Sequence, residues 1–342
     1  MSHAVNDAIA ALVRVIYLMD RGLLTAQKVR AFGRAADIVA RLEADELEAR
    51  VEAGTLTELD GIGPSTSEVI TQAVRGEPVT RIEKLEAETA IEPGVGGAIR
   101  ERLRGDCHSH TVWSDGGATV ETMSRAAQAL GHEYLVITDH SPRLTVAHGL
   151  SRERLLAQLD EIDDVNQRLA PFRVLRGMEV DIFEDGSLDM DDDVLARLDV
   201  VVASAHSKLS MDAGAMTRRF VVAIANPHVD VIGHCTGRKL VGRGRSQSRF
   251  DAEVVFAAAK QFDTAVEINC RPERLDPPRR LLRLAAEWEV PLTISTDAHA
   301  PGQLEWQAYG CARAAECGID PERIMNTRSV DDLLEWTAAH AA

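Results

Sequence analysis

The amino-acid sequence predicts an α/β protein in which a closed or nearly closed barrel of parallel strands follows a small all-helical region. Up to about residue 85, apolar residues recur at helical spacing, and no strand-like alternation interrupts them. From residue 105 onward, short β-branched runs alternate with helical stretches, which is typical of βα units around a parallel sheet. The change of pattern indicates where the two parts of the chain meet.

The helical region, residues 1–85, is predicted from two apolar series and from the turns between them. Glycines 54, 61 and 63 mark those turns. Residues 86–104 contain IEPGVGG and IRERLRG, and they are expected to form a linker with a short helix. The barrel is expected to occupy residues 105–342. The two apolar series are Ile9, Leu12, Val13 and Ile16, and then Val29, Phe32, Ala36, Val39 and Leu42.

Seven strands are predicted for the barrel, and the first is a short one before His108. The sequences between the strands, such as SRERLLAQLDEIDDVNQRL and DPPRRLLRLAAEWE, have helical spacing. Seven strands with intervening helices favour a closed or nearly closed barrel over an open sheet. The other six strands are predicted at 134–138, 173–180, 200–205, 229–233, 264–268 and 291–296.

The composition limits the function classes. The chain has 342 residues, of which 45% are apolar, so a proper core can be buried. Its net charge of −16 disfavours general nucleic-acid binding, because phosphates require a positive surface. The segment 236–250 is an exception, with no acidic residue, and it is either a phosphate-binding site or a solvated loop. Its basic residues are Arg238, Lys239, Arg243, Arg245 and Arg249.

The cysteines and the apolar runs indicate a cytoplasmic protein with no membrane segment. The five cysteines are widely spaced and form no CxxC pair, so we expect reduced, mostly buried thiols. The longest apolar runs fall far short of a bilayer span. At the N-terminus, no basic stretch is followed by an apolar run of the kind found in signal peptides.

Potential metal ligands stand at or near the ends of the predicted strands. In parallel α/β barrels the carboxyl ends of the strands form one rim, so residues far apart in sequence are expected to converge there. His-x-His and Asp-x-His pairs place both side chains on one face of an extended segment. The nine candidate ligands are His108, His110, Asp115, His140, Glu179, His206, His234, Asp297 and His299.

Imidazole and carboxylate together suit Zn, Mn or Fe rather than Mg or Ca. Nine ligands are too many for one ion, and with a bridging carboxylate they suit two or three. A single histidine is more often a core or surface residue, and we apply that interpretation to the remaining histidines. For the nine residues above, packing is a poor explanation, because the histidines stand at strand ends beside small residues. The histidines left out are His3, His132, His148, His228 and His340.

Several motifs resemble those of the PHP (polymerase and histidinol phosphatase) superfamily of metal-dependent phosphoesterases. They are GDCHSHTVWSDG, ITDHS, GMEVDI, SAHS, VDVIGH, VEIN and STDAH, and the resemblance covers about residues 105–340. It implies a distorted (β/α)7 barrel with three divalent metal ions. One ion would be held by His108, His110, Glu179 and Asp297. Glu179 would bridge to a second ion held by His206 and His234, and Asp115, His140 and His299 would hold the third.

A narrower resemblance is to the PHP domain of bacterial family X DNA polymerases. It rests on SPRLTVAHGLS, NPHVDVIGHCTGR and VEINCRPERLD, and on an N-terminal helix-hairpin-helix centred on Gly61, Ile62 and Gly63. Such a hairpin can present backbone N–H groups to a DNA phosphate. The chain departs from that family in having no room between hairpin and barrel for a polymerase palm. Val69 stands where the family's lyase lysine would fall, so neither nucleotide addition nor lyase activity is expected.

The expected reaction is phosphoester hydrolysis by direct attack of water, because no Ser, Cys or Asp nucleophile motif is visible. The residues predicted to be catalytic are Asp115, His140, Glu179, His206 and Asp297. Basic residues that follow strand ends could bind the substrate phosphate, although each could equally form a surface salt bridge. Asp139 and Asp181 could orient imidazoles or cap helices. The candidate phosphate-binding residues are Arg143, Lys208, Arg238, Lys239 and Arg271.

Three functions remain open at the level of the sequence. The first is a hydrolase acting on DNA ends, as a 3′–5′ exonuclease or a 3′-phosphatase, which the hairpin and the basic segment favour. The second is a small-molecule phosphomonoesterase, such as a histidinol-phosphate phosphatase, which the shared metal motifs and the acidic charge favour. The third is a DNA-binding scaffold with a silent barrel, which the complete ligand set disfavours.

Overall fold

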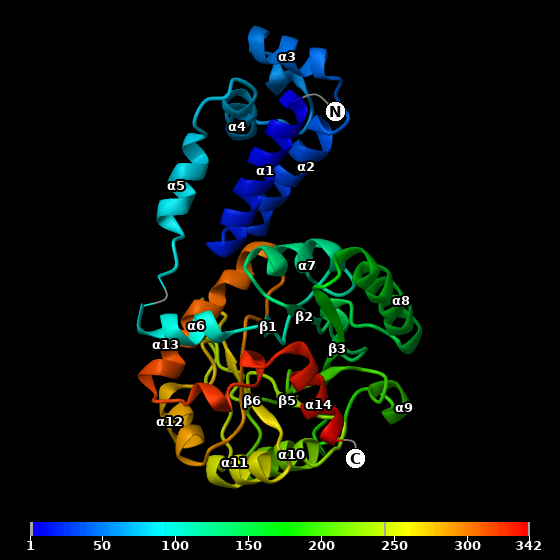
Figure 1. Cartoon of the computed structure of the whole chain (residues 1–342), viewed down its shortest axis with the longest axis vertical. Coiled ribbons are helices and arrows are strands. Elements are labelled where there is room, and N and C mark those ends of the chain that lie inside the picture. Colours follow the sequence, from blue (N-terminus) through cyan, green and yellow to red (C-terminus); the bar gives the residue numbers. More distant parts are fainter. Residues whose placement is uncertain (1–2, 93, 243, 341–342) are drawn as a thin grey trace. The chain divides into compact units, whose positions relative to one another are not determined.

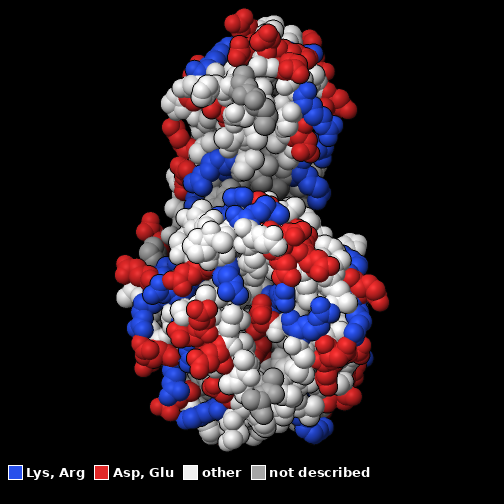
Figure 2. Space-filling view, turned by 45° about the vertical axis from the view of Figure 1, so that its right-hand side comes forward, with Lys and Arg blue, Asp and Glu red and all other residues white. Residues whose placement is uncertain are grey.

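The computed structural model describes residues 3–92, 94–242 and 244–340. The chain divides into two compact units, residues 1–90 and 91–342 (Figure 1). On the face shown in Figure 2, acidic and basic side chains lie interspersed on both units. Among the described helices, none combines the length and the apolar character needed to cross a bilayer. The five cysteines are buried and form no disulfide.

The first unit is helical, as its apolar spacing predicts. Helix α1 is its centre, because α2, α4 and α5 all pack against it. Its buried face includes Leu12, Val15 and Leu18, which recur at helical spacing and meet Phe32 and Ile70 from other helices. The helices are α1 (His3–Arg21), α2 (Ala26–Val39), α3 (Ala44–Ala53), α4 (Pro64–Val74) and α5 (Thr80–Glu88), with a 3₁₀ turn at Leu56–Glu58.

The glycine hairpin connects this 3₁₀ turn to α4. Gly61 has a φ of +94° and lies against Ile38, so a side chain there would be both strained and crowded. The backbone N–H of Gly63 donates to Oγ1 of Thr66, which fixes the start of α4. Ile62 is buried between the two glycines. The backbone therefore has the tight turn between helices that the sequence predicts for residues 61–63.

The segment suggested as a linker, residues 86–104, is divided between the two units. Helix α5 continues to Glu88, and the second unit begins at Ile91. The 3₁₀ turn η2 (Gly94–Gly96) and helix α6 (Gly97–Arg102) pack against α13 (Gln307–Glu316). Gly96 fits closely there, because an added Cβ would overlap the backbone of Cys311 and Ala312. The short helix expected in this segment is therefore part of the barrel unit.

The second unit is a nearly closed barrel of seven parallel strands, and the predicted fold is confirmed. The strands are hydrogen-bonded in sequence order, each one parallel to the next. Strands β3, β4 and β6 are buried along almost their whole length, which explains their continuous apolar runs. The strands are β1 (Gly105–Asp106), β2 (Tyr134–Ile137), β3 (Arg173–Asp181), β4 (Val200–Ser204), β5 (Val231–Ile232), β6 (Ala265–Asn269) and β7 (Leu292–Ser295).

Side chains and an isolated bridge join β1 to β7 and close the ring. Ser109 and Ala298 form a parallel bridge just beyond the two strands. The buried carboxylate of Asp106 accepts hydrogen bonds from the backbone N–H and the hydroxyl of Thr296. This closure brings the chain after β1 beside the chain after β7, although the two segments are far apart in sequence.

Helices surround the barrel, and one of them, α14, covers the end at which the strands begin. Trp336 of α14 packs with Tyr134, Leu175 and Val231 across the end of the barrel opposite the strands' carboxyl ends. The helices are α7 (Val120–Ala129), α8 (Arg152–Leu169), α9 (Asp192–Leu195), α10 (Ala213–Ile224), α11 (Ala252–Gln261), α12 (Arg279–Glu287), α13 and α14 (Val330–His340).

Candidate metal centre

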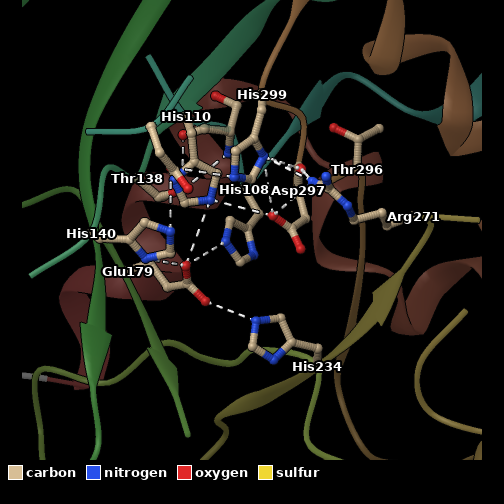
Figure 3. Close-up of polar contacts among 12 residues, drawn as sticks. His108, His110, Thr138, His140, Glu179, His234, Arg271, Thr296, Asp297 and His299 are labelled. Atoms are coloured by element: carbon tan, nitrogen blue, oxygen red, sulfur yellow. Dashed lines mark hydrogen bonds and ion pairs between the residues drawn. The ribbon is translucent and has the colours of Figure 1, made fainter. Parts of the chain in front are cut away.

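The structure brings all nine predicted ligands together at the carboxyl ends of the strands. Figure 3 labels His108, His110, His140, Glu179, His234, Asp297 and His299 among them. His108 and His110 follow β1, and the bridge between Ser109 and Ala298 holds them beside Asp297 and His299 after β7. Successive strands supply the others as each one ends. Those are His140 after β2, Glu179 within β3, His206 after β4 and His234 after β5. Asp115 comes from the loop between β1 and α7.

Glu179 stands at the centre of this group, and its two oxygens face different histidines. Oε1 lies 2.9 Å from Nε2 of His234 and 3.2 Å from Nε2 of His206. Oε2 lies 3.4 Å from Nε2 of His108 and 3.6 Å from Nε2 of His110. The carboxylate is 1% exposed, so it has little water to solvate its charge. This arrangement suits a carboxylate that bridges two cations.

A second group forms beside Asp115, which is the most exposed of the nine ligands. Its Oδ1 lies 3.3 Å from Nε2 of His299 and 3.5 Å from Nε2 of His140. Asp297 lies 3.4 Å from Nε2 of His110, which stands between the two groups. The rings of His110 and His299 are also close here, with 4.2 Å between their centroids and an angle of 34° between their planes.

The separations of the donor atoms suit coordination to metal ions better than hydrogen bonding between the side chains. Two ligand atoms bound tetrahedrally to zinc lie about 3.3 Å apart, which resembles the separations above. Nε2 of His108 and both ring nitrogens of His110 are buried without a hydrogen-bond partner among the described residues. Leaving such atoms unsatisfied is costly, and coordination to a cation would satisfy them. Three groups of these residues each have donor atoms that all lie within 4.8 Å of one another. Together the three groups cover the larger part of the site. The residues therefore fit the expected three divalent ions.

Charges in the site keep the carboxylate ligands Glu179 and Asp297 in the ionised form that metal binding requires. Burial of Glu179 would raise its pKa, but the imidazoles of His206, His108 and His140 hold that pKa well below its usual value. Burial would also raise the pKa of Asp297. The hydrogen bond to His110 and the positive charge of Arg274 instead hold that pKa well below its usual value. Both carboxylates are therefore ionised at neutral pH.

The histidines divide into two kinds. Burial, with the nearby charges of His299 and His140, holds the pKa of His110 well below its usual value. Burial would also lower the pKa of His206, but Glu179 and Asp181 raise it to about 9. The negative charge of Glu179 thus attracts protons to its neighbours, and a divalent cation can take the place of those protons.

Buried carboxylates behind the ligands orient their rings. Oε1 of Glu267 lies 2.7 Å from Nδ1 of His108, and its Oε2 accepts from the backbone N–H of His234. Asp181 lies 3.3 Å from Nδ1 of His206, which is one of the two roles expected from the sequence. Both contacts turn the Nε2 atom toward Glu179. Glu267 is not among the residues predicted from the sequence, although its place inside a predicted strand, in the motif VEIN, is a visible signal.

Asp139 does something else. Its carboxylate accepts from the hydroxyls of Thr111 and Ser114 and from the amide of Gln158. It therefore holds the loop that carries Asp115, and among the described residues no hydrogen bond joins it to an imidazole.

Two ligand positions have strained backbone conformations. His234 has a φ of 20° and Asp297 a φ of 54°, both in the region that non-glycine residues rarely adopt. Such strain costs on the order of 1–3 kcal/mol per residue and is often found at functional sites. It is maintained at His234 by the hydrogen bond to Glu267.

A cavity of about 320 Å³ opens above the ligands. Of the predicted phosphate-binding residues, Lys239 and Arg271 line it, and Arg245 and Arg274 join them. The other three lie outside this lining. Arg143 pairs with Asp181 and stacks on Phe183, and Arg238 donates to the carbonyls of Arg274 and Leu275. Lys208 has no ion pair among the described residues. Arg243 of the basic segment lies outside the described residues.

Comparison with known proteins identifies one family model and several similar proteins. A family model described as the PHP domain matches residues 106–269. "DNA polymerase/3'-5' exonuclease PolX" of Bacillus subtilis is 41% identical over 68% of this chain, which spans 40% of that relative's length. A protein named "Probable phosphatase", from Thermoanaerobacter sp. strain X514, is 30% identical over 65% of this chain and 89% of its own length.

Among solved structures, histidinol phosphate phosphatase from Lactococcus lactis, complexed with zinc, L-histidinol and phosphate, matches with a TM-score of 0.43 and 16% identity. The match covers 64% of this chain and 95% of that one. The matched family model spans the segment from β1 to β6, within which seven of the nine candidate ligands and Glu267 lie. The chain belongs to the PHP family.

Proposed function

We propose that this chain is a metal-dependent phosphoester hydrolase that acts on DNA ends, as a 3′–5′ exonuclease or a 3′-phosphatase. The observation that carries the proposal is the convergence of nine candidate metal ligands beneath a cavity with a basic wall. A cavity of this kind suits a substrate that is anionic where it meets the metals.

The residues of the site divide the chemical work. His108, His110, Glu179 and Asp297 would hold one ion, His206 and His234 would hold a second that shares Glu179, and Asp115, His140 and His299 would hold a third. Bound divalent ions acidify water at neutral pH and neutralise charge on a phosphate. Arg271 lies beside Asp297 and His299, 19% exposed, and can stabilise negative charge that develops on the phosphoryl oxygens.

Two observations favour DNA as the substrate. The relative with 41% identity is named as a 3'-5' exonuclease, and its similarity covers 68% of this chain. The helical unit has a glycine turn, Gly61 to Gly63, that leads directly into α4. Backbone N–H groups in that position can meet a DNA phosphate.

A small phosphomonoester is the second candidate substrate. The relative named "Probable phosphatase" aligns over 89% of its own length, so its similarity to this chain includes most of that protein. The cavity volume of about 320 Å³ is at the lower end of the range for small-molecule sites.

The deciding experiment compares the two substrates on protein loaded with manganese. One assay follows the shortening or dephosphorylation of 3′-end-labelled DNA, and the other follows phosphate release from histidinol phosphate. Asp297→Ala is the control, since it removes a ligand of the site. We expect rapid DNA processing that this substitution abolishes.

The other outcomes identify the alternatives. Turnover of histidinol phosphate alone would contradict the proposal and make the chain a small-molecule phosphatase. If the protein takes up no zinc or manganese after loading, the barrel is silent and the scaffold hypothesis replaces both.

A further inference from the structure

The cavity above the metal site has one strongly basic wall. Lys239 and Arg245 come from the segment after β5, and Arg271 and Arg274 come from the segment after β6. Lys239 and Arg245 exchange two backbone hydrogen bonds, so these two residues are held side by side as an antiparallel pair. The backbone N–H of Leu240 donates to the carbonyl of Glu273, which fixes this pair to the second segment. The position of the basic groups is therefore built by backbone contacts.

Two of the four basic groups, Arg271 and Arg274, lie against Asp297 of the metal site. Arg271 lies 2.9 Å from Glu273 and donates to the backbone carbonyl of Asp297 (Figure 3). Arg274 pairs more loosely with Asp297, with 3.4 Å between Nε and Oδ2. Because Asp297 is a metal-ligand candidate, its negative charge is shared with the cations that it would bind. Arg274 is then left with little compensation for its own charge.

The positive charges of Arg245 and Lys239 are not fully compensated by acidic side chains among the described residues. Arg245 has no ion pair among the described residues, and its guanidinium makes one hydrogen bond, from Nε to the carbonyl of Gly237. Lys239 is half exposed, and its ion pair with Glu273 is long, at 3.9 Å. Glu273 already forms a closer ion pair with Arg271. Partial burial and then the charge of Arg274 lower the pKa of Arg245, so the two guanidinium groups lie within electrostatic range.

Like charges held close together are unfavourable unless an anion joins them. Arg238 donates to the carbonyls of Arg274 and Leu275, which joins the two segments and maintains this proximity. A phosphate between the two segments would compensate the charges of Arg245, Arg274 and Lys239 together. The scissile phosphate would bind the metal ions that the nine ligands hold. These three basic side chains could therefore bind a different phosphate.

The facing wall of the cavity is aliphatic. It consists of Leu144, Val146 and Ala147, which follow β2, across the barrel from β5 and β6. Val146 is 84% exposed, the largest value among the exposed large apolar side chains of the described residues. An uncharged wall opposite a basic wall directs the anionic part of a substrate to one side and an apolar part, such as a base or a sugar, to the other.

We propose that Lys239, Arg245 and Arg274 bind a second phosphate of the substrate, adjacent to the scissile one, and so select polynucleotide ends over isolated phosphoesters. This inference rests on the proposed function and assigns its specificity to named residues. A substrate with one phosphate would use the metal ligands and Arg271 alone. A longer strand would gain the additional contacts, with its terminal nucleoside against Val146.

The test compares two substrates that differ in the second phosphate. One is a 3′-end-labelled single-stranded oligonucleotide, and the other is a dinucleoside monophosphate, which has a single phosphodiester. The full chain, loaded with manganese, is assayed with Arg245→Gln, with Lys239→Gln and with Arg249→Gln. Arg249 is the matched control, because it is an exposed arginine of the same basic segment that does not line the cavity.

We expect Arg245→Gln to raise KM for the oligonucleotide about tenfold more than KM for the dinucleoside, since one charge-assisted contact is lost. Lys239→Gln should act in the same direction. The slope of log KM against log salt for the oligonucleotide should fall by about 0.7, the value for one phosphate contact on a single strand. In Arg249→Gln the ratio of the two KM values should remain that of the parent protein.

Two results would overturn the inference, and they differ. Equal losses on both substrates in Arg245→Gln, with DNA still processed by the parent protein, would remove the second phosphate site and leave the proposed function intact. If the parent protein cleaves neither nucleotide substrate but hydrolyses histidinol phosphate, the proposed function itself fails and the second site fails with it.

Discussion

Glu179 can connect two cations because its oxygens face opposite pairs of histidines. His206 and His234 approach Oε1, whereas His108 and His110 approach Oε2. Nδ1 of His140 also lies 2.8 Å from Oε2, so a shorter or uncharged side chain at this position would leave five imidazoles without a shared partner. The bridging role implied by the family motifs thus has a direct counterpart in the geometry, and it remains a prediction until metal is bound.

Glu267 offers a test of how the ligands are oriented. Replacing Glu267 by Gln keeps the size of the side chain but removes the charge that faces Nδ1 of His108. We expect metal affinity to fall by about 10- to 100-fold, as is usual when a carboxylate behind a metal ligand is lost. Competition with a chelator of known affinity measures this directly.

Glu273→Gln is the matched control, because Glu273 lines the same cavity but pairs with Arg271 rather than with an imidazole. If both variants lose affinity to the same extent, the effect is a general loss of negative charge, and the orienting role of Glu267 is wrong.

His132 should make the stability of the barrel sensitive to acid. Burial is the main cause that lowers its pKa from 6.5 to about 3, and the charge of Arg100 adds to it. The folded protein therefore stays unprotonated here while the unfolded chain takes up a proton. The contribution of His132 is complete above pH 6.5 and is lost as the pH falls toward about 3. The slope in that window is about 1.4 kcal/mol per pH unit.

Urea unfolding of the parent protein and of His132→Gln, both treated with chelator, measures this contribution. We expect the difference between their free energies of unfolding to change with pH below 6.5 and to be constant above it. Parallel curves through the acidic range would contradict the assignment. Because the metal ligands are common to both proteins, their titration cancels in the difference.

At the scale of elements, each strand delivers its ligands to one rim because the strands are parallel and the helices return the chain to the opposite end. The ligands after β1 and β7 meet only because Asp106 and the bridge between Ser109 and Ala298 close the ring. An open sheet with the same strands would separate His110 from Asp297. The closure is therefore part of the metal site as well as of the fold.

The docking of η2 and α6 on α13 can be tested with neighbouring glycines. Gly96→Ala places a Cβ against the backbone of α13, which cannot move as a side chain can, so we expect a loss of roughly 1–3 kcal/mol. Gly97→Ala has open space and lies in α6, where alanine is favoured over glycine by about 0.5–1 kcal/mol. Thermal unfolding should thus shift in opposite directions for the two variants. Equal shifts would mean that this contact is absent.

At the scale of the whole molecule, the two units have separate hydrophobic cores. One core contains only residues of the helical unit, and the others contain only residues of the barrel unit. Such units are expected to fold independently. Removing residues 1–90 should leave a folded barrel that binds as many metal ions per chain as the full protein does.

Metal analysis and thermal unfolding of the fragment 91–342 measure this expectation. The fragment 105–342 is the matched control, because it also lacks η2 and α6, and we expect it to unfold at a lower temperature. A fragment 91–342 that aggregates or binds fewer ions would show that the helical unit supports the barrel. Loss of DNA processing with metal binding retained would assign the helical unit to substrate binding.

The sequence by itself determined the barrel and the nine candidate ligands. Both follow from local patterns, because strands read as apolar runs and the residues that end parallel strands share one rim. His-x-His and Asp-x-His spacing needs only an extended backbone. These features depend on neighbours in the chain, so His108, His110, Asp297 and His299 were visible before any tertiary contact was known.

Only the tertiary structure decided which other polar residues serve the site. Arg238 and Arg245 lie in the same basic segment, yet the first is engaged by backbone carbonyls and the second lines the cavity. Glu267 reaches His108 across the barrel, and residues 94–102 pack on a helix about two hundred positions away in the chain. The physical reason is that a long side chain takes its direction from contacts that only the closed fold supplies.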